Sequence, residues 1–136
     1  MAYDINWLIP GRVIELSLFG NVTDDDLIAM NAELTQSVGK LIGKSKLHVI
    51  YNGSNIEQPY LNLERAAQVM TIYRDEQVGW FVLTGKMSPV VHFLTTSFAA
   101  KVKLSLASAQ DRDEALDLLL NHDSSLAADL IKSLAS

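Results

Sequence analysis

The sequence contains no cysteine among its 136 residues. Disulfide bonds, a thiolate nucleophile and a zinc site built on sulfur are therefore excluded. No apolar run reaches the roughly 18 residues needed to span a bilayer. Residues 1–7 also lack the basic region and apolar core of a signal peptide. We therefore expect a cytoplasmic protein without a transmembrane segment.

Positive charge is scarce as well. Eleven Lys and Arg residues face sixteen Asp and Glu residues, which gives a formal net charge of −5. Affinity for the phosphate backbone of nucleic acids comes largely from clustered Lys and Arg, so we expect no nucleic-acid partner. The densest basic group is Lys40, Lys44 and Lys46, and we interpret it as cations near the negative pole of a helix end.

The length and composition are those of an ordinary globular protein. The apolar fraction is 49% and the charged fraction is 20%, a balance that favours a packed core over a disordered tail. A chain of this length can bury such a core without disulfides or metals. We expect residues 1–136 to form a single domain.

The hydrophobic pattern predicts alternating strands and helices. Tyr3, Ile5 and Trp7 alternate with polar residues, a Pro10-Gly11 turn follows, and the alternation resumes over 14–18, as in a hairpin. Buried strands separated by helices imply parallel pairing with right-handed crossovers. The further predicted elements are helices over 23–43, 62–73, 89–101, 108–120 and about 124–135, and strands over 47–51, 78–84 and 104–107.

Three helix starts have capping signals. Thr23 is followed three residues later by Asp26, Ser88 precedes a proline, and Ser108 is followed three residues later by Asp111. We interpret the acidic triplet 24–26 as the start of a helix. A metal site needs several convergent oxygens, and the triplet has no EF-hand spacing. We therefore expect no metal.

The clearest candidate site follows the strand over 47–51. This apolar run stops in the polar residues Asn52, Gly53, Ser54 and Asn55, which predict a turn at the carboxyl edge of the sheet. Open α/β folds place their working residues at that edge. We take Asn52, Gly53 and Ser54 as candidate contact residues.

The order of elements and several short motifs resemble the STAS, or SpoIIAA-like, domain family. The motifs are the opening hairpin, Gly20–Thr23 before the first helix, the strand His48–Ser54, and Ala109–Leu116 after the last strand. The resemblance covers residues 3–121. It implies an α/β layered fold with a mostly parallel sheet of about five strands, with the helix over about 124–135 as an addition.

The chain departs from this family at the phosphoacceptor. In the family the third strand usually ends in an aspartate, and a serine or threonine at a helix start some ten residues on is phosphorylated. This chain has Asn52 in place of the aspartate and Gln58-Pro-Tyr-Leu-Asn62 in place of the motif. Ser54 is the nearest hydroxyl but lies too early, so we expect a turn residue and no phosphoswitch.

The remaining polar residues offer little catalytic chemistry. His48 lies inside a strand and is predicted to pack in the core, whereas His92 falls near the carboxyl edge. No nucleophile elbow or Ser-His-Asp order accompanies His92. Gly39–Ser45 has the wrong spacing and position for a phosphate-binding loop. We expect no cofactor and no catalytic residues, and keep an enzyme that uses His92 as a third hypothesis.

Two apolar helices point to binding instead. The helix over 89–101 is apolar almost all round, which is typical of a helix covered on several sides. The C-terminal helix could cover it, or either helix could contact a second chain. A third option is an apolar ligand enclosed near 89–101. The candidate contact residues are Ser88, His92, Phe93 and Phe98 on the first helix, and Leu126, Leu130, Ile131 and Leu134 on the second.

The sequence thus favours a non-catalytic STAS-like domain that acts through protein contacts. We expect a regulatory partner or a homodimer, because the third crossover helix is apolar and catalytic groups are missing. The alternative is a binder of a small apolar or lipid ligand in a pocket near the helix over 89–101.

Overall fold

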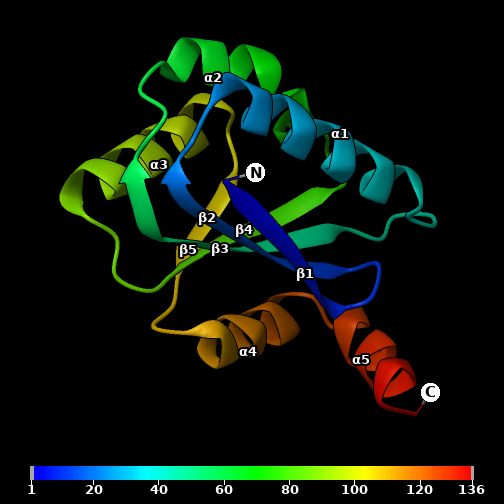
Figure 1. Ribbon diagram of the computed structural model, residues 1–136. Helices are drawn as coiled ribbons and strands as arrows, with labels where there is room; N and C mark the ends of the chain where they lie inside the picture. Colours follow the sequence, from blue (N-terminus) through cyan, green and yellow to red (C-terminus); the bar gives the residue numbers. More distant parts are fainter. Residues whose placement is uncertain (1, 136) are drawn as a thin grey trace.

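A five-stranded sheet with helices on both faces forms the molecule (Figure 1). The computed structural model describes residues 2–135. The strands are β1 (Tyr3–Ile9), β2 (Val13–Asn21), β3 (Leu47–Gln58), β4 (Val78–Thr84) and β5 (Ser105–Ser108). The helices are α1 (Asp24–Gly39), α2 (Leu63–Val69), the 3-10 helix η1 (Thr71–Arg74), α3 (Pro89–Lys101), α4 (Arg112–His122) and α5 (Ser125–Ala135).

The strands lie in the order in which they occur in the chain. β1 pairs with β2 as an antiparallel hairpin, and β2 to β5 are parallel. Each parallel pair is joined by a crossover helix. Because right-handed crossovers that advance in one direction all fall on one face, α1, α2 and α3 lie on the same side of the sheet (Figure 1). The α/β layered fold predicted from the sequence is confirmed.

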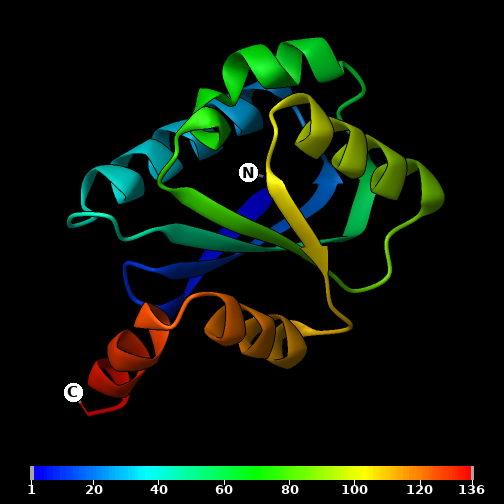
Figure 2. The ribbon, with the colours of Figure 1, turned by 180° about the vertical axis from the view of Figure 1, so that it is seen from behind.

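The other face of the sheet is covered by α4 and α5 (Figure 2). Alternate residues of β3 therefore enter two cores: Val49 and Tyr51 face α1 to α3, and Ile50 faces α4 and α5. A strand buried on both faces has the continuous apolar run that the sequence contains. None of the helices within residues 2–135 is long and apolar enough to cross a membrane.

The helix caps agree with the sequence in two cases of three. Thr23 and Asp26 form a capping box at the start of α1, and the Ser88 hydroxyl accepts a hydrogen bond from the backbone N–H of Val91. The third prediction is wrong, because Asp111 and not Ser108 caps α4, through the N–H of Glu114. Ser108 instead ends β5, where strand pairing already uses its backbone.

Two helix ends also differ from the predicted ones. α1 ends at Gly39 rather than at Gly43, which lies in a turn with φ +61°. The helix predicted over 62–73 breaks at Met70, whose backbone leaves the helical region, and continues as η1. Apolar spacing persists across both breaks, so periodicity alone gave no signal for them.

β3 does not stop at Asn52 as predicted. It continues to Gln58, paired with β2 alone, because β4 ends opposite Asn52 at Thr84. One extra residue of β3 lies between the pairs Ser17–Asn52 and Phe19–Asn55, which is a β-bulge. The polar residues that suggested a turn therefore form a bulge in a strand that extends past its neighbour.

The C-terminal helix does not cover α3. α5 packs beside α4 under the opposite face of the sheet, near β1 (Figures 1 and 2). A pocket between α3 and α5 is therefore ruled out, because the sheet separates them. The link between α4 and α5 is short, so α5 stays on the same side of the sheet as α4. The apolar stripe of α5 alone did not indicate which side that is.

Candidate functional site

The bulge in β3 is held by the side chain of Asn52. Its Oδ1 atom accepts hydrogen bonds from the backbone N–H of Ser54, at 3.0 Å, and from the Ser54 hydroxyl, at 2.6 Å. Gly53 is buried, and a Cβ atom there would lie 3.0 Å from the Tyr51 ring. Asn52, Gly53 and Ser54 therefore form a closed local unit at the carboxyl edge.

α3 begins beside this unit and presents one apolar side outward. Val90 is 57% exposed and Phe93 is 65% exposed, whereas Val91 and Ala99 are buried on the inner side. Leu61, in the loop before α2, is also exposed at the carboxyl edge. The helix was expected to be covered by another element or by a second chain, and within residues 2–135 no element covers its outer side.

His92 lies on an exposed part of α3. Among the described residues its imidazole makes no hydrogen bond or ion pair, and only its backbone is engaged, through the N–H to Ser88 and the carbonyl to Thr96. The structure therefore brings Asn52 and Ser54 together but does not join His92 to them. The arrangement contains no linked nucleophile and base.

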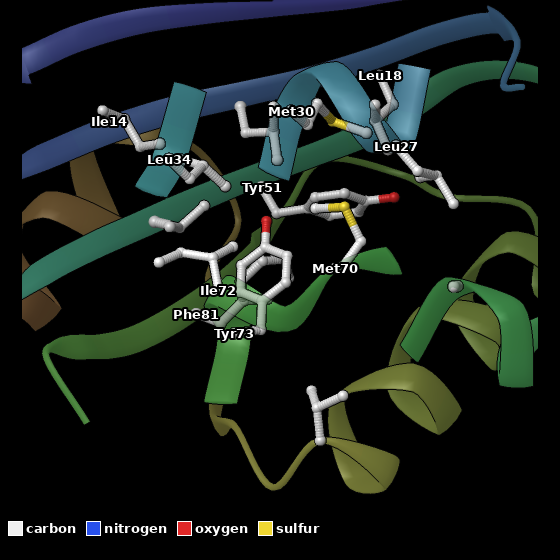
Figure 3. Packing of buried hydrophobic residues seen from close by; sticks show 14 of the residues in the cluster. Ile14, Leu18, Leu27, Met30, Leu34, Tyr51, Met70, Ile72, Tyr73 and Phe81 are labelled. Atoms are coloured by element: carbon white, nitrogen blue, oxygen red, sulfur yellow. The ribbon is translucent and has the colours of Figure 1, made fainter. Parts of the chain in front are cut away.

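An apolar cavity of about 100 Å³ lies between α1, α2, α3 and the sheet. Side chains from these elements converge on it, and Figure 3 shows Tyr51, Met70, Tyr73 and others pointing toward one another. Phe98 lines the cavity from α3. The other lining residues include Leu16, Leu18, Leu27, Met30, Ile56, Tyr60, Leu63, Ala66, Phe81, Val91, Leu94 and Thr95.

Two tyrosine hydroxyls give this cavity its polar character. Burial raises the pKa of both Tyr51 and Tyr73 above the ordinary value, so both remain neutral phenols. Tyr51 accepts a long hydrogen bond from the Thr95 hydroxyl, at 3.4 Å. The cavity can therefore receive a small apolar group but offers no charge to bind an ion.

A buried polar cluster occupies the opposite, amino edge of the sheet. Arg12 precedes β2 and is only 6% exposed. Its guanidinium donates to Asp123 at 2.9 Å, Asp129 at 2.6 Å, the Ser125 hydroxyl at 3.0 Å and the carbonyl of Lys46 at 2.9 Å. These bonds attach the corner between α4 and α5 to the sheet. We call Arg12, His48, Asp123, Ser125 and Asp129 the Arg12 cluster.

His48 is fixed in one tautomer within this cluster. Its Nδ1 atom accepts the backbone N–H of Trp80 at 2.9 Å, so Nε2 carries the proton and donates to Asp123 at 2.8 Å. Gly79 makes room for the ring, since a Cβ atom there would lie 2.4 Å from it. The pairing of β3 with β4 shifts by one residue at this point.

Burial and hydrogen bonding set the charges of this pair. Burial lowers the pKa of His48, although Asp123 opposes the shift, so the imidazole is neutral near pH 7. Burial would raise the pKa of Asp123, but hydrogen bonds from His48 and Ser125 and the charge of Arg12 lower it below the ordinary value. His48 is thus buried in the core, as predicted, and is in addition a hydrogen-bonded member of a polar cluster, which was not predicted.

The predicted stripe on α5 divides into two parts. Leu126 is fully buried against α4 and the sheet, and Leu130 is half-buried. Ile131 is 66% exposed and Leu134 is 78% exposed. The first two residues hold α5 to this chain, so only the last two lie free for contact with another surface.

Sequence reasoning missed the Arg12 cluster. The hydrogen bonds that join Arg12 and His48 to the segment from Asp123 to Asp129 span 75 to 117 positions, so no local spacing links the two halves of the cluster. The one available signal was a histidine inside an otherwise apolar strand, because a buried polar group needs a partner. Glu15 of β2, bound by both Nε and Nη2 of Arg112, was missed for the same reason.

Comparison with known proteins gives a structural likeness. No family model and no curated protein matches the sequence. The fold is similar to that of the anti-sigma factor antagonist SpoIIAA in its unphosphorylated form, with a TM-score of 0.65 and 16% sequence identity over 88% of this chain and 97% of that one.

A second solved structure agrees. It is an uncharacterized protein of the DUF3478 family from Shewanella loihica PV-4 with a SpoIIAA-like fold, with a TM-score of 0.63 and 14% identity over 87% of this chain and 92% of that one. The chain therefore has the SpoIIAA-like, or STAS, fold, as its motifs suggested. At these identities the likeness establishes the fold alone.

Proposed function

We propose that this chain is a non-catalytic interaction domain that binds a protein partner through the outer side of α3. The observation that carries the proposal is that α3 is apolar on both sides, with Val90 and Phe93 exposed beside the carboxyl edge. A helix of that kind is usually covered. The fold it shares with an anti-sigma factor antagonist supports a regulatory role.

The first partner to test is a second copy of this chain. In the unmodified protein we expect an assembly larger than a monomer by sedimentation equilibrium, and its loss in Phe93→Ser. The matched control is Ile42→Ser, which alters an exposed apolar residue in the turn after α1. Both residues are exposed, so both variants should melt like the unmodified protein.

If the unmodified chain is a monomer, a regulatory partner is sought by pulldown from the source cells. A protein that is retained by the unmodified chain and by Ile42→Ser, but lost by Phe93→Ser, supports the proposal. A strict monomer that recovers no such protein contradicts it.

We further propose that the domain works without phosphorylation. Asn62 caps α2, and its side-chain oxygen accepts a hydrogen bond from the backbone N–H of Arg65 at 2.9 Å. An amide side chain therefore lies at the helix start where the STAS family carries the phosphorylated hydroxyl. Partner binding should be unchanged in Ser54→Asp, since the added charge would lie outside the α3 face. This proposal would be contradicted if the variant lost partner binding and if intact-mass measurement showed that the unmodified protein is phosphorylated.

The apolar cavity supports a second candidate, the binding of a small apolar ligand. Cavities lined by apolar side chains stay dry and accept molecules such as benzene. With benzene as the probe, we expect saturable NMR shifts at cavity residues and a higher melting temperature. Ala66→Leu should block both effects by filling the cavity, whereas Ala128→Leu on exposed α5 should not. An absence of saturable shifts would rule out apolar ligand binding in this cavity.

A further inference from the structure

A second pocket, of about 310 Å³, lies at the amino edge of the sheet, where the parallel strands begin. Lys44 and Lys46 border it from the segment before β3, Trp80 and Ser105 from the sheet, and His122 from the end of α4. We call it the amino-edge pocket. It shares no residue with the α3 face or with the lining of the apolar cavity.

The side-chain acceptors at the base of this pocket are already engaged. Asp123 uses Oδ2 for Arg12 and His48, and Oδ1 for the backbone N–H and hydroxyl of Ser125. His48 uses its free nitrogen for Trp80. A cationic ligand would therefore find no free carboxylate among the lining residues.

Several donors around the pocket are not engaged. Within residues 2–135, the ammonium groups of Lys44 and Lys46 form no ion pair or hydrogen bond, and both side chains are exposed. The Ser105 hydroxyl and the His122 ring nitrogens also lack a hydrogen-bond partner there. The pocket thus offers positive charge and free donors without matching acceptors, in a chain whose net charge is −5.

One wall of the pocket is aromatic. The rings of Trp80 and His122 lie against each other with centroids 4.8 Å apart. Trp80 is held in place because its backbone N–H is bonded to His48. An apolar part of a ligand can lie against such a fixed aromatic surface, while charged groups elsewhere in the pocket set its orientation.

We infer that the amino-edge pocket binds a small organic anion. Its phosphate or carboxylate oxygens accept charge-assisted hydrogen bonds from Lys44 and Lys46, and its organic part contacts Trp80. The pocket is of the size that metabolite-sized ligands occupy, a few hundred Å³. This inference is independent of the proposed function at α3.

Trp80 itself provides the readout. The chain has two tryptophans, so Trp7→Phe leaves Trp80 as the single fluorophore. This protein is titrated at low salt with phenyl phosphate, inorganic phosphate and benzoate. We expect a saturable change in emission, tightest for phenyl phosphate or for benzoate according to which oxyanion the lysines prefer, and weaker binding of inorganic phosphate.

Matched charge variants locate the binding. Lys44→Gln with Lys46→Gln should weaken binding by about tenfold, which corresponds to the loss of a charged hydrogen bond. Arg65→Gln with Lys86→Gln removes the same charge from exposed positions at the carboxyl edge, away from the pocket, and should change the affinity less than about twofold. Thermal melts that match the Trp7→Phe protein verify that both double variants fold.

Three results would overturn the inference. The first is no saturable signal with any of the three anions. The second is an equal loss of affinity in the two double variants, which means general attraction to positive charge. The third is equal affinity for inorganic phosphate and phenyl phosphate, which removes the organic group from the ligand.

Discussion

Arg12 and Arg65 both bind aspartate, but in different surroundings. The Arg12 side chain is 7% exposed, whereas the pair of Arg65 with Asp24 is open to solvent on both sides. Removing one partner of a buried pair leaves an uncompensated charge, while exposed pairs contribute little. The environment, and not the type of residue, therefore decides which arginine stabilises the fold.

We predict that Arg12→Met lowers the free energy of unfolding by about 3 kcal/mol. Arg65→Met should lower it by less than about 1 kcal/mol. Urea unfolding followed by circular dichroism measures both. Similar losses in the two variants would mean that the Arg12 cluster does not hold α5 to the sheet.

His48 makes stability depend on pH. Its pKa is lowered in the folded protein from the ordinary 6.5, so just below pH 6.5 the unfolded chain binds more protons than the folded one. The free energy of unfolding then falls as the pH decreases, with a slope of up to about 1.4 kcal/mol per pH unit. Asp123 acts only at lower pH, because its own pKa lies below 3.8.

We predict that the unmodified protein loses stability between pH 7 and pH 5.5 and that His48→Asn loses this dependence. His92→Asn, at an exposed position, should retain it. Urea midpoints at intervals of half a pH unit provide the measurement. A slope that survives in His48→Asn would assign the proton uptake to another group.

At the scale of elements, α5 is held by its first turn and free at its last. Leu126 is fully buried and Leu134 is mostly exposed, although both belong to one sequence stripe. The hydrogen bonds of the Arg12 cluster also reach only the first two turns, at Ser125 and Asp129. The free end is therefore the part of α5 that can meet another surface.

We predict that Leu126→Ala destabilises the protein by about 3 kcal/mol through the cavity it leaves. Leu134→Ala should change stability by less than about 0.5 kcal/mol. Thermal unfolding of the two variants compares them directly. A large loss in Leu134→Ala would indicate that the end of α5 is covered in solution.

Element order could be predicted from the sequence, but several boundaries could not. Alternation and capping residues gave the strands, the helices and two caps, because these signals act within a few residues. The extension of β3 past Asn52 depends on pairing with β2, and polar residues there resemble a turn when considered alone. The side of the sheet taken by α5 depends on contacts with residues more than a hundred positions earlier.

At the scale of the molecule, one sheet serves two cores. β2, β3 and β4 place side chains in both the core under α1 to α3 and the core under α4 and α5. Loss of either core exposes the other face of the same strands, so the two layers should not unfold separately.

We predict that single-tryptophan variants report the same unfolding transition. Trp80→Phe leaves Trp7, on edge strand β1, and Trp7→Phe leaves Trp80, which packs against the core of α4 and α5. After correction for the stability change of each substitution by circular dichroism, fluorescence should give one urea midpoint for each variant. A fluorescence midpoint that differs from the circular dichroism midpoint would mean that the layers separate.

The candidate site was only partly accessible to sequence reasoning. Asn52, Gly53, Ser54 and Ser88 were identified because their types stand out locally, and the structure puts the first three in one hydrogen-bonded unit. An apolar pocket near 89–101 was proposed from the sequence, but most of the residues that line the cavity could not be identified, and the amino-edge pocket was missed, since each combines residues from four or more elements. The sequence contains these residues, but it does not show which of them are neighbours in the folded protein.

The Arg12 cluster also bears on the synthesis of the chain. Arg12 leaves the ribosome 117 positions before its partner Asp129. Until then the guanidinium at the edge of the nascent sheet has no carboxylate to bind. The amino edge of this domain therefore remains incomplete until α5 has been synthesised.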